Sequence, residues 1–145
     1  MIVALVTVAI VFVAWVAWDN ARIVVTKIEV ESARLPESFD GYRIAHVSDL
    51  HNDEFGEDNE KLLTLIKEAE PDMIAITGDL LDSRRTSVEK AQNFVQQAVQ
   101  IAPCYYVTGN HESRIEKEYG QLEKAMTEAG VIVLRNDKLT LEKDG

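Results

Sequence analysis

The sequence predicts an α/β protein with a mainly parallel sheet, preceded by one membrane-spanning helix. Short apolar segments rich in β-branched residues alternate with longer segments that carry apolar residues at helical spacing. This alternation is typical of parallel strands joined by crossover helices. A separate apolar stretch begins the chain, and 145 residues suffice for about one domain.

The first 18 residues predict a transmembrane helix. They carry no charged side chain, and at 1.5 Å per residue they would span roughly 27 Å, close to a bilayer's hydrocarbon core. Trp15 and Trp18 lie where aromatic rings favour the membrane interface. A cleaved signal peptide is the alternative, but a basic start and a small-residue cleavage site are missing. We expect residues 1–18 to anchor the protein in a cell membrane by a single pass. Arg22 and Lys27 follow this helix and weakly favour a cytoplasmic location for the rest of the chain, but two charges do not determine the side of the membrane.

The composition of the rest of the chain limits the classes of partner that we expect the protein to bind. All charged residues follow the apolar stretch, 25 acidic against 15 basic, so the net charge is −10. Nucleic-acid binding is not expected, because it needs a basic surface to displace counterions. A single cysteine, Cys104, excludes an internal disulfide and a cysteine-rich zinc finger, and we expect it to be buried in the core. The composition does not indicate an oligomeric state.

Strands are expected at the apolar segments. Residues 22–32 partly alternate between apolar and polar side chains, and a turn follows at 35–41, so residues 19–41 are interpreted as a strand and linker. The main domain then occupies residues 42–145. Its expected strands are 42–47, 73–77, 104–108, 131–134 and 138–143.

Helices are expected between these strands. Asp58 is placed to cap the first helix, and capping boxes formed by Thr86 with Glu89 and by Ser113 with Glu116 would begin the next two. The expected apolar faces are Leu62, Leu65, Ile66 and Ala69; Val88, Ala91, Val95, Ala98 and Ala102; and Ile115, Tyr119, Leu122, Met126 and Ala129.

Polar clusters follow three of the strands. Asp49, Asp79 and Asn110 are 30 and 31 residues apart, about one strand–helix–strand unit each. The carboxyl ends of parallel strands meet at one edge, where ligands bind in open α/β sheets. With His51 and His111, these side chains make a mixed oxygen and nitrogen set suited to Mn²⁺, Fe²⁺ or Zn²⁺. Asp79, on the middle strand, could bridge two cations that activate water for phosphoryl displacement.

The three clusters match a motif series. They are D-x-H at residues 49–51, G-D-x-x-D at 78–82 and G-N-H-E at 109–112. The series resembles that of the calcineurin-like metallophosphoesterase family. The segment 39–44 and the apolar start look like the membrane-anchored bacterial branch. The resemblance implies a metallophosphoesterase-type α/β sandwich, of which residues 42–145 would be the N-terminal half.

The resemblance also implies roles for individual residues. Asp49 and His51 would hold one metal, Asp79 would bridge both, and Asn110 would bind the second. His111 would be catalytic and not a ligand, stabilising the transition state or protonating the leaving oxygen. The cofactors would be two divalent ions, manganese first, with iron, zinc or magnesium as alternatives. The reaction would be hydrolysis of phosphomono- or diesters, lipid-linked or nucleotide-type, by a metal-bridging hydroxide.

Neighbouring residues receive secondary interpretations. By the same resemblance Asp82 would orient His111 through a hydrogen bond. Arg84 and Arg85 could contact a substrate phosphate, although a solvated pair in a loop is slightly favoured. His46 is expected to be a hydrogen-bonded core residue, and Glu112 to accept hydrogen bonds locally near a helix start.

One departure from the family pattern limits these expectations. The family's second half supplies further histidines, whereas no histidine follows His111 here. We therefore expect the 145-residue chain alone to bind metals weakly and to be inactive or weakly active; Asp144-Gly145, a hairpin turn signal, also favours a missing second half. The alternative is a truncated, non-catalytic membrane-anchored binding or regulatory protein. A doubly wound domain with an aspartyl nucleophile is a weaker alternative, because it gives the G-N-H-E motif no role.

Overall fold

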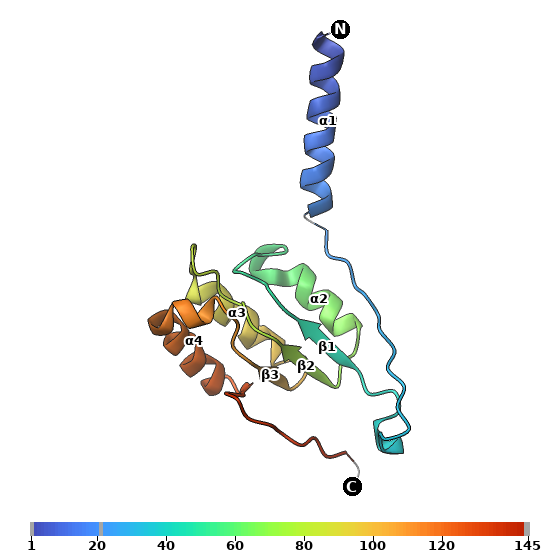
Figure 1. Ribbon diagram of the computed structural model, residues 1–145, viewed down its shortest axis with the longest axis vertical. Helices are drawn as coiled ribbons and strands as arrows, with labels where there is room; N and C mark the ends of the chain where they lie inside the picture. Colours follow the sequence, from blue (N-terminus) through green and yellow to red (C-terminus); the bar gives the residue numbers. More distant parts are fainter. Residues whose placement is uncertain (1, 21, 144–145) are drawn as a thin grey trace.

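Four short parallel strands form one sheet in the computed structural model, which describes residues 2–20 and 22–143 (Figure 1). The strands lie in chain order, and each pairs in parallel with the next. The helices and strands are α1 (Ile2–Asn20), β1 (Ile44–Val47), α2 (Glu60–Glu68), β2 (Met73–Ile76), α3 (Val88–Ala98), β3 (Cys104–Tyr106), α4 (Glu116–Glu128) and β4 (Ile132–Val133). The predicted α/β class with a parallel sheet is confirmed.

Helices α2, α3 and α4 cover one face of the sheet. Since every crossover connects to the next strand in the same direction, right-handed connections place all three helices on one side. The core between them contains Ile74 and Ile76 from β2, Phe94 from α3 and Leu122 from α4, each at most 1% exposed. The expected apolar faces of α3 and α4 are buried as predicted, through Ala91, Val95 and Ala98 and through Tyr119, Leu122 and Met126.

The opposite face of the sheet is open. Ile44 is 57% exposed, and Ile132 is 38% exposed. His46 lies on this face, where its Nε2 is 2.6 Å from the Thr77 hydroxyl. The prediction of a core histidine is therefore wrong, because its neighbours Ala45 and Val47 point to the helices and alternate residues of a strand point to opposite faces.

Two predicted strands do not form. Residues 22–32 run as an extended segment with Val24, Ile28 and Val30 more than 70% exposed, and the described part of the chain offers it no pairing strand. Residues 138–143 also lack strand structure; Leu139 and Leu141 instead line a groove of about 230 Å³ with residues of the open face. A strand needs a partner for its main-chain groups, and β-branched composition cannot supply one.

The helix starts differ from the predicted caps. Helix α2 begins after Asn59, and Asp58 lies in a left-handed turn with φ 49°. Ser87, and not Thr86, caps α3 by accepting a hydrogen bond from the main-chain nitrogen of Lys90. Helix α4 follows Ile115 without a side-chain cap, so the Ser113 capping box is wrong too. The predicted hairpin turn at 144–145 lies outside the described residues.

Helix α1 stands apart from the domain (Figure 1). Its span Ile2–Asp19 has a mean hydropathy of 2.3, and none of that span is buried against the rest of the described chain. By length and composition it is able to cross a membrane.

Candidate metal centre

The loops that follow β1 and β2 run side by side at the carboxyl edge of the sheet. The main-chain nitrogen of Asp49 donates to the carbonyl of Gly78 at 3.2 Å, and that of His51 donates to the carbonyl of Asp79 at 2.9 Å. These bonds continue the pairing of the two strands beyond their ends. The D-x-H and G-D-x-x-D motifs are thereby held in register.

Three motif residues adopt a left-handed backbone conformation that is uncommon for residues other than glycine. Asp49, His51 and Asp79 have φ values of 55°, 49° and 50°. Non-glycine residues in this left-handed region cost of order 1 kcal/mol or more each, and such strain clusters at functional sites. The left-handed turns bend the chain sharply where the strands end.

Two glycines let the loops after β2 and β3 touch. A Cβ on Gly78, which has φ 91°, would lie 2.5 Å from the nitrogen of Gly109. A Cβ on Gly109 would collide with the carboxylate and the main-chain nitrogen of Asp79. No side chain fits at either position, so the first residue of the G-D-x-x-D motif and that of the G-N-H-E motif provide the space in which the motifs meet.

The loops bring His51, Asp79 and His111 together. One ligand atom from each lies within 4.8 Å of those of the other two. Asp79 is only 7% exposed, and its Oδ1 accepts a hydrogen bond from the main-chain nitrogen of His111 at 2.7 Å. The two imidazole ring centroids are 4.4 Å apart. The sequence predicted that these residues converge, and the structure brings them within reach of one cation.

Asp49 and Asn110 lie at the rim of this group. The Asp49 side chain is 63% exposed, with its Oδ1 3.7 Å from the Nε2 of His51, and it accepts a hydrogen bond from the Ser48 hydroxyl. Asp49 is thus a neighbour of His51 and not a member of the closer triad. Asn110 is exposed in the loop between Gly109 and His111.

Asp82 lies beside His111 at an ion-pair distance. The Nδ1 of His111 is 3.5 Å from the Oδ1 of Asp82, while the main-chain nitrogen of Ser83 donates to Nδ1 at 3.0 Å. Because Nδ1 accepts that hydrogen bond, the neutral ring carries its proton on Nε2. A hydrogen bond from the main-chain nitrogen of Arg84 lowers the pKa of Asp82, and the positive charge of Arg85 acts in the same direction.

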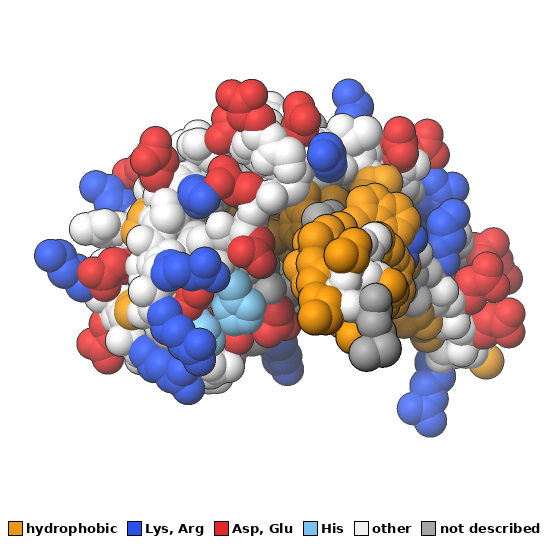
Figure 2. Space-filling view, turned by 90° about the horizontal axis from the view of Figure 1, so that it is seen from above, with side chains coloured by type: hydrophobic (Ala, Val, Ile, Leu, Met, Phe, Trp, Pro, Cys, Tyr) orange, Lys and Arg blue, Asp and Glu red, His pale blue; other side chains and the backbone are white. Residues whose placement is uncertain are grey.

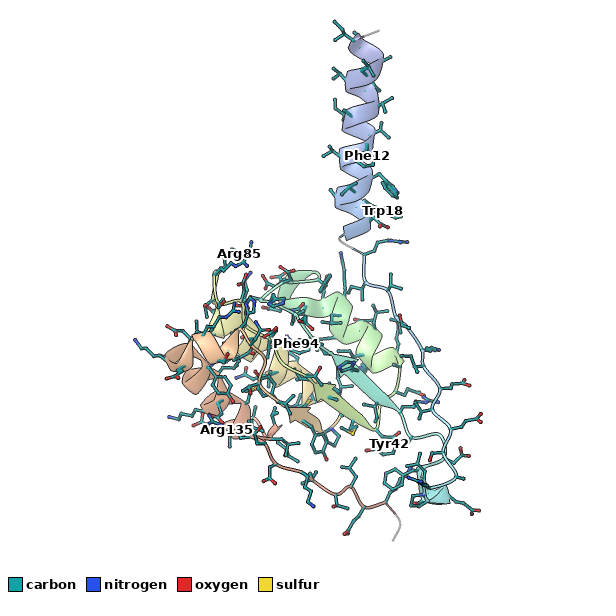
Figure 3. The ribbon with its side chains drawn as sticks, in the orientation of Figure 1. Phe12, Trp18, Tyr42, Arg85, Phe94 and Arg135 are labelled. Carbon is teal, nitrogen blue, oxygen red and sulfur yellow. The ribbon has the colours of Figure 1, made fainter. Side chains whose placement is uncertain are left out.

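Arg84 and Arg85 lie in the exposed loop between β2 and α3, with Arg85 near its tip (Figure 3). The Arg85 side chain is 82% exposed, and its Nε lies 3.6 Å from Asp82. Seen along α1, basic side chains gather beside the histidines (Figure 2). Both arginine side chains are exposed, and Arg85 is at ion-pair distance from Asp82.

Sequence reasoning missed the roles of half-buried Asn52 and buried Glu112. The side-chain oxygen of Asn52 accepts from the main-chain nitrogens of Asp82 and Ser87, and its amide donates to the carbonyl of Ser87. Glu112 is completely buried and accepts hydrogen bonds from both the β2 and the β3 loops. The local role expected for Glu112 is therefore too narrow. The one sequence feature that pointed to Glu112 was its place as the last residue of the G-N-H-E motif.

The chain belongs to the calcineurin-like phosphoesterase family, whose model matches residues 42–142. It is 33% identical over 103 residues to the uncharacterized metallophosphoesterase YkoQ of Bacillus subtilis, covering 68% of this chain and 38% of that protein. It is 32% identical over 124 residues to YkuE of the same organism, another uncharacterized metallophosphoesterase, covering 80% of this chain and 42% of YkuE.

A vertebrate relative shares the same region. A transmembrane protein with a metallophosphoesterase domain from Danio rerio is 31% identical over 90 residues, or 61% of this chain and 21% of the fish protein. The chain thus spans about two fifths or less of the length of these relatives. No solved structure matches the chain significantly.

Proposed function

We propose that the protein is a membrane-anchored, metal-dependent phosphoesterase that hydrolyses phosphomono- or diesters. The observation that carries the proposal is the convergence of His51, Asp79 and His111 within 4.8 Å in a chain of the calcineurin-like family. Two divalent cations are proposed, with manganese first and iron, zinc or magnesium as alternatives. Helix α1 is proposed to hold the domain at a membrane.

The chemistry of the site fits a divalent cation. The Nδ1 of His51 is buried and lacks a hydrogen-bond partner among the described residues. Such an atom costs free energy unless it is paired. In the same triad Asp79 is buried, and negative charge in a protein interior is costly unless it is compensated. A cation at the triad would add a partner for an imidazole nitrogen and for this carboxylate.

Each residue of the site has a distinct proposed task. Asp49 and His51 would hold one cation, Asn110 the other, and Asp79, whose carboxylate lies between the β1 and β3 loops, would contact both. When bound, divalent cations lower the pKa of water and neutralise charge on a phosphoryl group. Such chemistry accords with an acidic protein acting on an anionic substrate, because bound cations dominate the local field.

His111 is proposed to act on the leaving group through its Nε2, by stabilising the transition state or by protonating the leaving oxygen. Its Nε2 carries the proton of the neutral ring, because Nδ1 is already the acceptor for Ser83. The Asp82 carboxylate lies 3.5 Å from the Nδ1 of the same ring. Arg84 and Arg85 would attract the phosphate ester to the loop edge.

Manganese binding tests the proposal. We expect the 145-residue chain in detergent to bind Mn²⁺ weakly, followed by loss of the free-ion electron paramagnetic resonance signal, and the variant Asp79→Asn to lose that binding. Asp40→Asn, which removes an exposed carboxylate before the amino end of β1, the end opposite the site, is the matched control and should bind like the wild type. Hydrolysis of p-nitrophenyl phosphate and its bis ester, with and without a chelator, is the second measurement. Failure of Mn²⁺, Fe²⁺, Zn²⁺ and Mg²⁺ to bind, or binding unaffected by Asp79→Asn, contradicts the proposal and favours the non-catalytic alternative.

A further inference from the structure

Glu112 is a buried carboxylate that accepts hydrogen bonds from three main-chain N–H groups. Its exposed fraction is 0%. Its Oε2 accepts hydrogen bonds from the nitrogens of Asp79 and Gly109, and its Oε1 accepts from the nitrogen of Leu81, each at 2.9 Å. Within the described part of the chain, none of the ion pairs includes Glu112.

This arrangement uses both oxygens of the carboxylate as acceptors. A buried carboxylate is strongly unfavourable unless it is hydrogen-bonded, and hydrogen bonds to a charged acceptor are about twice as strong as neutral ones. Three N–H groups directed at two oxygens satisfy the charge without a cation.

The hydrogen bonds of Glu112 connect two loops that are distant in the sequence. Asp79 and Leu81 follow β2, whereas Gly109 precedes Glu112 by three residues in the loop after β3. The connection is reciprocal, because the nitrogen of His111 donates back to the carboxylate of Asp79 at 2.7 Å. Each loop therefore supplies one carboxylate that accepts main-chain hydrogen bonds from the other.

We propose that Glu112 is a positioning residue for the metal centre: it clamps the β2 loop to the β3 loop so that the Asp79 carboxylate and His111 face each other. The inference rests on the proposed function where it concerns metal binding. The clamp itself concerns only the protein's own atoms. Outer groups of this kind typically change metal affinity about 10- to 100-fold when they are removed.

Glu112→Gln is the sharpest variant. Glutamine has nearly the same shape, but one of its two terminal atoms is an NH₂ group that donates and cannot accept. Whichever way the amide is turned, it faces at least one of the three main-chain N–H groups with a donor. Glu116→Gln, four residues further on at an exposed position, makes the same chemical change and is the matched control.

The first readout needs no metal. In amide NMR spectra of the full chain in detergent, the N–H protons of Asp79, Leu81 and Gly109 should be shifted downfield and exchange slowly with solvent. In Glu112→Gln these protons should move upfield, and nuclear Overhauser contacts between Gly78 and Gly109 should weaken. Glu116→Gln should leave both signals unchanged. Wild-type amides at these positions that exchange as fast as that of exposed Asn110 contradict the clamp, and this result does not require any variant to fold.

The second readout is Mn²⁺ affinity. We expect Glu112→Gln to weaken it by about 10-fold or more, and Glu112→Asp, which keeps both acceptors, to recover part of the loss. The recovery also distinguishes positioning from a global folding defect if the glutamine variant unfolds. A wild-type chain that binds Mn²⁺ and keeps its affinity in Glu112→Gln overturns the inference alone. A wild-type chain that binds no cation overturns the proposed function and with it the part of Glu112 in metal binding.

Discussion

The main-chain nitrogen of His111 donates a hydrogen bond to the Asp79 carboxylate at 2.7 Å, across 32 residues of sequence. The contact involves the backbone of His111, so the imidazole is free for another task. It also places a motif residue of the β3 loop directly against the carboxylate proposed to bridge two cations. Replacing the His111 side chain therefore separates its chemistry from the architecture of the site.

Substitution His111→Asn should lower turnover and spare metal binding. The main-chain contact with Asp79 survives, whereas the proton on Nε2 is lost. A general acid contributes about 10²- to 10⁴-fold to a rate, so we expect kcat for phosphate esters to fall by about that factor with Mn²⁺ affinity maintained. Steady-state kinetics and Mn²⁺ titration measure the two effects, and His46→Asn on the open face of the sheet is the control. A parallel loss of affinity would mean that His111 is a metal ligand.

Alanine substitutions at Gly109 and Gly120 should have opposite effects on stability. A Cβ at Gly109 meets the Asp79 carboxylate, so overpacking should lower the free energy of unfolding by about 1–3 kcal/mol. Gly120 lies within α4 with open space around it, so alanine should raise that free energy by about 0.5–1 kcal/mol. Chemical denaturation followed by circular dichroism gives both values. Equal effects of the two substitutions would contradict the close contact between the β2 and β3 loops.

The sequence predicted that the motif loops meet at one edge of the sheet, because that convergence follows from the strand topology. Once strands β1, β2 and β3 are parallel and follow in order, Asp49, Asp79 and Asn110 must lie at one edge. The strands themselves were recognisable since each is a short apolar segment that pairs with strands of the same domain. To predict that the motifs meet, it was enough to know their spacing in the sequence and the handedness of the strand connections.

The same reasoning failed where a structure depends on a distant partner. Residues 22–32 have strand composition and no strand to pair with among the described residues. Glu112 resembles a helix-start residue locally, yet two of its three donors lie 31 and 33 residues away. His46 lies in a strand, and only the arrangement of the helices decides which face of that strand is covered. Spacing in one sequence does not report such contacts.

Replacing Asn52 by alanine should loosen the loop that carries Arg84 and Arg85. The Asn52 side chain accepts hydrogen bonds from the nitrogens of Asp82 and Ser87 and donates one to Ser87. Leaving partly buried groups unpaired costs about 1–3 kcal/mol, which should appear as a lower free energy of unfolding in denaturant titrations. Asn93→Ala, which removes an exposed bond to Asp58, should change it by less than about 0.5 kcal/mol. Similar losses in both variants would show that Asn52 has no special part in holding this loop.

Cys104 should resist alkylation in the folded protein. Its thiol is 1% exposed in β3, donates to the carbonyl of Ala102, and has a pKa that burial raises to about 11. The thiolate is the reactive form of cysteine, so at pH 8 iodoacetamide should modify Cys104 only after denaturation. Intact mass measurements would show this.

The raised pKa of Cys104 also predicts a pH dependence of stability. Above pH 9 the thiol of the unfolded chain loses its proton, whereas the thiol of the folded protein keeps it. The contribution of this group to the free energy of unfolding is therefore fully present below pH 9 and is lost as the pH rises towards 11. Cys104→Ala removes this contribution, and its unfolding free energy should decline less over that interval. Rapid alkylation of the native protein at pH 8, or identical pH profiles for the variant and the wild type, would show that the thiol is not held in the core.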